Sequence, residues 1–201
     1  MQQLPLAISP APEPSFDNYV AGANVEALAR VKSLAAGALP EAIVYLWGEP
    51  GSGRSHLVRA AARANPALVT ADDVELLDAA QQQALFVAID TARDGRAEVL
   101  AAGNAPPAHL GLREDLRTRL AWGLVYQLKP LTDAEKALYL RAEALRRGLR
   151  LTDEVVWYLL SHLPRDLQSL HGALERIDRH SLARKRPVTL PLIREALEKN
   201  P

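Results

Sequence analysis

Residues 48–55, with the sequence GEPGSGRS, have the types and the spacing of a phosphate-binding loop. The glycines of this loop are Gly48, Gly51 and Gly53. Glycine lets backbone amides turn toward an anion. The spacing matches Gly-x-x-x-x-Gly-Lys-Ser/Thr with one departure, because Arg54 stands where lysine is usual. Ser55 supplies the hydroxyl expected on a magnesium ion, so the pattern predicts a nucleotide site.

The elements on either side of the loop support this prediction. Residues 43–47 are an unbroken apolar run, typical of a buried parallel strand. Residues 56–64 are rich in alanine and contain neither glycine nor proline, which predicts a helix. The amino end of that helix adds partial positive charge beside an anion. A glycine-rich turn that binds nothing is the alternative, and it is disfavoured because strand, helix, end glycines and Ser55 all agree.

Arg54 affects the prediction of nucleotide binding and the prediction of nucleotide hydrolysis differently. Lysine is a compact point charge, whereas arginine is a bulkier planar fork. A loop shaped for lysine still holds a nucleotide with arginine, but fast hydrolysis is less assured. We therefore expect binding with little intrinsic ATPase activity, and whether the chain is itself an enzyme stays open.

Two further apolar strands are expected to end in polar residues. Residues 67–71 lead to Asp72 and Asp73, which is the Walker-B pattern that holds magnesium and positions water. Residues 97–102 lead to Asn104, which in that position polarises the attacking water or the outer phosphate. The alternatives are local: the acidic pair caps a turn, and the asparagine satisfies a turn before two prolines.

The remaining pattern predicts an α/β domain followed by helices. In the first part we expect helices at 25–36, 78–93 and 112–121 and a strand at 124–128. Asn24 is a good N-cap, and two pairs form capping boxes, Asp78 with Gln81 and Thr132 with Glu135. After Pro130 the strands stop, and we expect four helices at 132–147, 152–162, 165–182 and 189–197. The domains are therefore a mobile arm at 1–14, an α/β domain at 15–130 and a helical domain at 131–201.

Composition limits the classes of partner. The chain has 201 residues, 48% of them hydrophobic, and its 24 basic residues balance 24 acidic ones. Zero net charge disfavours a protein that coats nucleic acid, although the run at 184–186 is a local basic patch. Cysteine is absent, and no apolar run approaches the roughly 20 residues that span a bilayer. We expect a cytoplasmic protein that does not enter the membrane and binds DNA weakly or not at all.

The first residues form a proline-rich segment without a core pattern. Leu4, Leu6 and Ile8 nevertheless alternate with polar or small residues. This spacing suits an extended peptide that docks into pockets on a partner. A disordered tail is the alternative.

The complete set of features resembles the AAA+ ATPases, and among them the DnaA/Hda family. The stretches that carry this resemblance are residues 16–24, 117–124 and 164–174. The resemblance implies that Tyr19 lies over the nucleotide base, that Arg119 is an arginine finger and that Arg165 is the second sensor. A surface arginine paired with Glu114 or Asp115 is the alternative for Arg119. The similarity extends over nearly the whole chain from Phe16.

Within the family, the chain is most similar to short members that act with the sliding clamp to switch DnaA off. The sequence ends after the helical domain, so we expect no DNA-binding domain of the DnaA kind. The segment from Gly51 to Leu57, including His56, is similar to the arginine-bearing loop of those members. Gln3, Leu4 and Leu6 resemble their clamp-binding peptide.

The resemblance also implies the cofactors and the partners. The cofactors are ADP or ATP with magnesium, the metal held by Ser55 and Asp72. The partners are DnaA and the β subunit clamp of DNA polymerase III, and we also consider a second copy of this chain. Arg119 then acts catalytically in trans, and Asp73 and Asn104 act at the chain's own site.

The sequence departs from the family pattern in two places. Asn104 stands where the family usually has an acidic residue. The family also has a further strand and helix between the loop helix and Asp72, where this chain is short. We therefore expect a four-stranded sheet in which the first strand and the strand before Asp72 are neighbours.

Three functions follow as hypotheses. In the first, a nucleotide-bound regulator works with the clamp to stimulate hydrolysis of DnaA-bound ATP, and so negatively regulates replication initiation. In the second, a DnaA-family ATPase loads or remodels an initiation complex through its own turnover, which Arg54 disfavours. In the third, a nucleic-acid-binding module works through residues 184–186, which the zero net charge disfavours.

Overall fold

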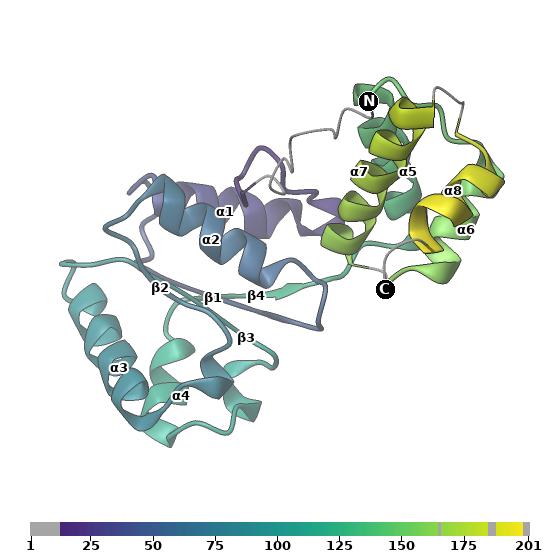
Figure 1. Ribbon diagram of the computed structural model, residues 1–201. Coiled ribbons are helices and arrows are strands. Elements are labelled where there is room, and N and C mark those ends of the chain that lie inside the picture. Colours follow the sequence, from purple (N-terminus) through teal and green to yellow (C-terminus); the bar gives the residue numbers. More distant parts are fainter. Residues whose placement is uncertain (1–12, 165, 185–187, 199–201) are drawn as a thin grey trace, which may run out of the picture. The chain divides into compact units, whose positions relative to one another are not determined.

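The computed structural model describes residues 13–164, 166–184 and 188–198. The chain divides into two compact units, one formed by residues 14–131 and a helical one that begins at Thr132. Each unit is described by itself (Figure 1). Within the described residues, no helix is both long enough and apolar enough to cross a membrane.

The first unit is built on a four-stranded parallel sheet in the order β2-β3-β1-β4. Its strands are β1 (Ile43–Gly48), β2 (Val69–Ala71), β3 (Val99–Gly103) and β4 (Leu124–Leu128). The predicted α/β class and the number of strands are confirmed. The expected strand order is wrong in one respect, because β3 lies between β1 and β2. A connection that passes over one strand leaves β1 in the sheet interior, with β3 and β4 as its neighbours.

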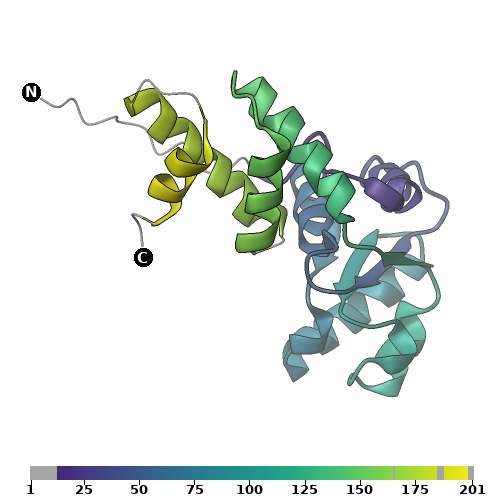
Figure 2. The same ribbon diagram turned by 90° about the vertical axis from the view of Figure 1, so that its right-hand side faces the viewer.

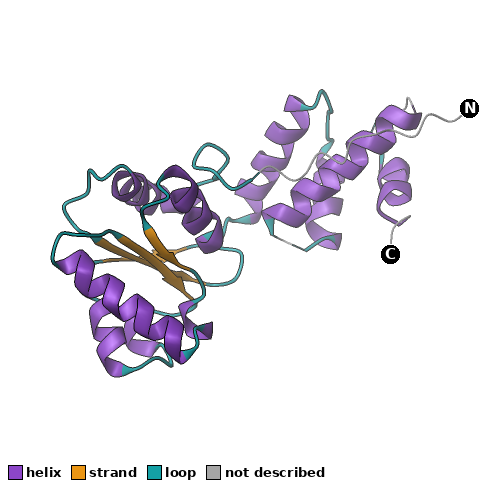
Figure 3. Ribbon diagram, turned by 60° about the vertical axis from the view of Figure 1, so that its left-hand side comes forward, coloured by secondary structure: helices purple, strands orange, loops and turns teal. Residues whose placement is uncertain are grey.

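Helices cover both faces of this sheet (Figure 3). The helices are α1 (Val25–Ala35) and α2 (Arg54–Ala64) on one face and α3 (Ala79–Arg93) and α4 (Glu114–Leu120) on the other. Short 3-10 turns occur at Gly22–Asn24, Val74–Leu76 and Pro107–His109. Helices on both faces are the usual cover of a parallel sheet in α/β domains.

Strand β1 supplies both hydrophobic cores because its side chains alternate between the two faces. Val44 and Leu46 pack with α1 and α2, whereas Ile43 and Tyr45 pack with α3 and α4. All four side chains are buried. A strand covered on both faces reads as a continuous apolar run, which is why residues 43–47 could be recognised in the sequence.

The second unit is helical (Figure 2). Its described residues form four helices. They are α5 (Asp133–Arg146), α6 (Asp153–His162), α7 (Leu167–Arg184) and α8 (Leu190–Glu198). Leucine and isoleucine side chains from all four form one core. Its most buried members include Leu140, Leu159, Leu170, Ile177 and Ile193.

Local signals set several helix ends as predicted. Asp78 and Gln81 form a capping box at α3, and Thr132 and Glu135 form one at α5. Asn24 precedes α1 as expected, but its side chain makes no capping hydrogen bond. Its amide donates to the Lys129 carbonyl oxygen and accepts from the Lys129 amide, each at 2.8 Å. This buried asparagine therefore ties the start of α1 to the end of β4.

Candidate functional site

The predicted polar residues converge on one edge of the sheet. All four strands are parallel, so their carboxyl ends meet at the same edge. Gly48 ends β1, and Asp72 follows β2. Asn104 follows β3, whose last residue pairs in register with Trp47. The structure thus brings the loop, the acidic pair and the asparagine together at the end where ligands bind in such sheets.

The loop has the backbone that its glycines were expected to allow. Gly51 and Gly53 have φ angles of +81° and +92°, in the left-handed region that favours glycine. A Cβ atom on Gly53 would lie 2.8 Å from the Tyr19 ring, and one on Gly48 would strike the carbonyl of Leu128. The eleven-residue helix α2 begins directly after Gly53. The loop is therefore closely confined between Tyr19 and β4.

Tyr19 and His56 close one side of the loop. Their rings lie 5.3 Å apart at 58°, and the His56 Nε2 atom is 2.9 Å from the Ser15 carbonyl oxygen. Burial lowers the pKa of His56, the hydrogen bond to Ser15 opposes the shift, and Arg59 adds to it. Burial therefore favours the neutral form of His56. The stretch before α1 is thus held against the first turn of α2.

Three buried polar atoms around the loop have no hydrogen-bond partner of good geometry among the described residues. They are Tyr19 OH, Ser52 Oγ and Arg54 Nη1. Burial raises the pKa of Tyr19, and the nearby Asn24 side chain offsets part of that shift. Buried polar groups in proteins are nearly always satisfied. Their concentration at a glycine-rich loop before a helix marks a place that a polar, anionic ligand fits.

Asp73 is the acidic residue nearest to the loop arginine. Its Oδ1 atom lies 3.6 Å from Arg54 Nη2. Its backbone has a φ of +45°, and its amide donates to the Asp72 carboxylate at 3.0 Å. The loop and the end of β2 are therefore linked by opposite charges.

Glu75 is a residue of this edge that sequence reasoning missed. Its Oε2 atom accepts a hydrogen bond of 3.2 Å from the amide of Asn104. Tyr45 lies alongside and donates to the Ala105 carbonyl oxygen at 2.8 Å. Burial raises the pKa of Tyr45, Glu75 raises it further, and Arg54 opposes the shift. The only signal for Glu75 in the sequence was one more acid shortly after Asp72 and Asp73.

Arg119 lies on α4 and is held by contacts with α3. Its Nε and Nη2 atoms donate to the Asp90 carboxylate at 2.8 and 3.4 Å. Its guanidinium lies 3.9 Å from the Phe86 ring centroid and 5.0 Å from that of Trp122. The suggested pairing with Glu114 or the Asp115 carboxylate is wrong, because the ion-pair partner is Asp90, and the contact with Asp115 is to its carbonyl oxygen.

The remaining predicted site residues either lie outside the described part of the chain or are known here only by their position in an element. Gln3, Leu4, Leu6 and Arg165 lie outside the described residues. Ser55 occupies the first turn of α2, and Asp72 follows β2. Among the residues that the structure describes, no three His, Cys, Asp or Glu side chains gather to hold a metal ion.

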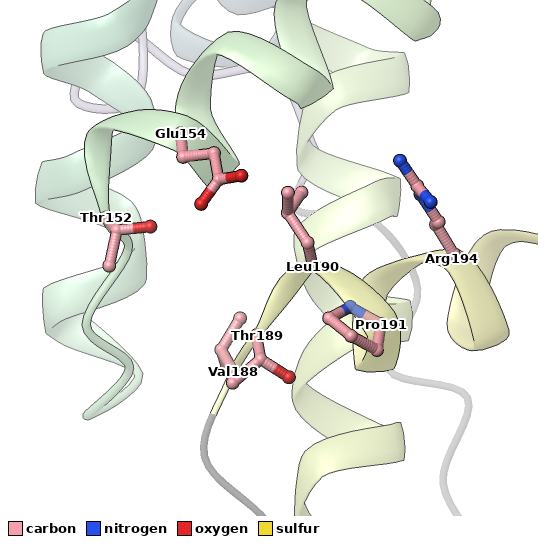
Figure 4. A pocket seen from close by; sticks show the side chains of 7 residues that line it. All are labelled: Thr152, Glu154, Val188, Thr189, Leu190, Pro191 and Arg194. Atoms are coloured by element: carbon pink, nitrogen blue, oxygen red, sulfur yellow. The ribbon is translucent and has the colours of Figure 1, made fainter.

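Two hollows lie away from this edge. One, of about 460 Å³, opens between the starts of α6 and α8 in the helical unit and is lined by Thr152, Glu154 and Arg194 among others (Figure 4). The other, of about 590 Å³, lies at the amino ends of β1 and β4 beside Arg93 and Trp122. Neither contains a residue predicted for the nucleotide site.

Comparison with known proteins gives a match for the helical unit and a relative that spans nearly the whole chain. Residues 133–197 match the family model described as "Hda, lid domain". An uncharacterized protein of Haemophilus influenzae is 28% identical over 228 residues, which cover 98% of each chain. That alignment is longer than this chain, so it includes positions of the relative that have no counterpart here.

Solved structures have the same fold. Domain III of the replication initiation protein DnaA from Thermotoga maritima superposes with a TM-score of 0.74 at 18% identity, over 94% of this chain and 97% of that one. AMPPCP-bound DnaA from Aquifex aeolicus gives 0.71 at 19% identity, over 94% and 68%. The RuvB branch migration motor of Thermotoga maritima gives 0.65 at 17% identity, over 92% and 71%.

Proposed function

Because its helical unit belongs to the Hda lid family and the chain has the AAA+ fold of the DnaA initiators, we propose that this protein is a nucleotide-bound regulator of replication initiation. In this proposal it works with the sliding clamp and stimulates hydrolysis of ATP bound to DnaA, which lowers initiation. Its site of action is the cytoplasm, where those partners work. A DnaA-related replication regulator is the part that the comparisons support directly.

The observation that carries nucleotide binding is the set of unsatisfied polar atoms at the loop, namely Tyr19 OH, Ser52 Oγ and Arg54 Nη1. Phosphate oxygens are acceptors that Ser52 and Arg54 lack. The residues proposed to hold ADP or ATP are Tyr19, Gly48, Gly51, Gly53, Arg54, Ser55, His56 and Arg165. Ser55 and Asp72 would hold a magnesium ion, and a bound nucleotide would supply further oxygen ligands from its phosphates.

Calorimetry with ADP and with ATP, each in the presence of magnesium, tests this half of the proposal. We expect specific binding of adenine nucleotide, with ADP retained rather than ATP turned over. The test variant is Arg54→Ala, which removes the buried guanidinium and should weaken nucleotide binding strongly. Absence of binding by the parent protein would reject the nucleotide site.

The second half of the proposal concerns the partners. Arg119 acts in trans on the ATP of a neighbouring DnaA, where its planar fork meets two phosphate oxygens as charge develops. In this structure the Arg119 guanidinium is paired with Asp90. That ion pair must therefore break when Arg119 reaches a phosphate held by DnaA. The arm residues Gln3, Leu4 and Leu6 hold the protein at the clamp and raise its effective concentration there. No direct contact with DNA is required.

A pull-down with the clamp and with DnaA–ATP, using the full chain and a chain lacking residues 1–10, tests these partners. We expect the full chain to bind both proteins and the shortened chain to lose the clamp. Equal clamp capture by both chains would remove the arm from the proposal. A second copy of this chain is a further partner to look for in the same experiment.

One arrangement favours a second function. Asp73 and Asn104 share the sheet edge with the loop, as the chain's own ATPase activity would need. A DnaA-family ATPase that loads or remodels an initiation complex is therefore the alternative. Steady ATP turnover by the isolated protein distinguishes it from the regulator.

A further inference from the structure

The guanidinium of Arg54 is buried with too few partners. Its side chain is only 11% exposed, and Nη1 lacks a hydrogen-bond partner within the described part of the chain. Nη2 faces one carboxylate oxygen of Asp73 at 3.6 Å. A guanidinium has five N–H donors in a fixed fork, so an arginine in this setting has one amino group directed by a carboxylate and another left for a different acceptor.

We propose that Asp73 is a positioning residue for Arg54. It holds one amino group of the guanidinium, so that the other is presented to a phosphate oxygen of the bound nucleotide. The proposal rests on the proposed nucleotide site. It also changes the role of Asp73, because a carboxylate that is paired with Arg54 is not available to position water for hydrolysis.

The backbone around Asp73 supports a fixed carboxylate. Its φ of +45° is unusual for a residue other than glycine and is better tolerated by Asp and Asn than by most others. The conformation is held from both sides, because the amide of Asp73 donates to Asp72 and its carbonyl oxygen accepts from Leu76 at 2.8 Å. The carboxylate therefore projects from a braced turn rather than from a loose loop.

Lysine cannot serve both groups in the same way. Its three N–H donors all sit on one nitrogen, so a phosphate oxygen and the Asp73 carboxylate would both have to lie within hydrogen-bond distance of that single atom, whereas the arginine fork spans acceptors that lie farther apart. An arginine at position 54 is therefore matched to an acid at position 73. The pairing links the loop to the end of β2 and favours a site that retains nucleotide over one that turns it over.

A double-mutant cycle on ADP affinity tests the inference. The variants are Asp73→Asn, Arg54→Lys and the two combined, measured by calorimetry with magnesium. Asparagine keeps the shape and tolerates the backbone angle, so the variant should fold. In the parent background we expect Asp73→Asn to weaken ADP binding about tenfold, because the ion pair that orients the guanidinium is lost. In the Arg54→Lys background we expect no weakening, or a slight gain because a negative charge near the phosphates is removed.

Glu49→Gln is the matched charge control. It removes an exposed acid from the same loop, at a residue with no ion pair to Arg54. Its effect on ADP affinity should be equal in both backgrounds. An equal effect of Asp73→Asn in both backgrounds, with ADP bound normally by the parent, would overturn the positioning role alone. A parent that binds no adenine nucleotide would instead reject the proposed function, and this inference with it.

Discussion

Replacing Arg119 with alanine removes two things that the structure shows together, an ion pair and an aromatic contact. The Asp90 pair is partly buried and has two N–O contacts, and the Phe86 ring lies 3.9 Å from the guanidinium. Each contact contributes about 0.5–1 kcal/mol, so Arg119→Ala should lower the free energy of unfolding by about 1–2 kcal/mol. For a domain of this size each kcal/mol lowers Tm by about 2–4 °C.

The loss of stimulated hydrolysis should be far larger than this loss of stability. The assay mixes the protein, the clamp loaded on DNA and DnaA–ATP, and measures conversion of the DnaA-bound nucleotide to ADP. Removal of an arginine that stabilises the transition state in trans costs about a hundredfold or more. We expect Arg119→Ala to remain folded at the assay temperature and to bind clamp and nucleotide, but to lose stimulation by at least that factor.

Asp90→Asn separates the two roles of Arg119. This change breaks the same ion pair and so lowers stability by about 0.5–1 kcal/mol, but it leaves the arginine and its contact with Phe86 in place. We expect it to retain or increase stimulation, because the guanidinium no longer has to leave a carboxylate. Arg117→Ala, on the same helix, should stimulate normally. If Asp90→Asn loses as much stimulation as Arg119→Ala, or if Arg119→Ala loses none, the trans-acting role is refuted and Arg119 only joins α3 to α4.

Three further outcomes are expected. Gly53→Ala should abolish nucleotide binding and lower Tm, because its φ is +92° and the Tyr19 ring lies 2.8 Å from the added methyl; normal calorimetry would contradict this. The folded protein holds the pKa of His56 below its ordinary 6.5 because of burial, so unfolding curves should show stability falling as the pH drops below about 6.5, and less steeply in His56→Gln. Changing Leu4 and Leu6 to alanine should abolish clamp binding with Tm unchanged, and clamp binding like that of the parent would reduce the arm to a tail.

Features set by a few neighbouring residues could be predicted from the sequence. The capping boxes at Asp78 and Thr132 and the turn at Gly53 depend on contacts within one or two turns of chain, and the structure has all three. The polar ends of the strands could be placed at one edge because parallel strands share their direction.

Features that depend on residues far apart could not be predicted. Asn24 is a good N-cap by type, but its amide is occupied by Lys129, which lies 105 residues later. Arg119 had acidic neighbours on its own helix, yet it pairs with Asp90 of another helix. The pattern of charges along one helix cannot show which acid pairs with Arg119, because the partner depends on how α3 and α4 pack on the sheet.

The central position of β1 in the sheet also has a consequence for the order in which the chain folds. Val44 is paired with Leu100 on one side and with Leu124 on the other, and both partners are synthesised long after it. Until β4 has been synthesised, at least one edge of β1 has no hydrogen-bonded neighbour. Bringing β1 together with its partners also closes long loops, which costs chain entropy before the strand pairing contributes any stabilisation. We therefore expect the loop at Gly48 to take its final shape late in folding, once residues from the far end of the domain have closed the sheet around it.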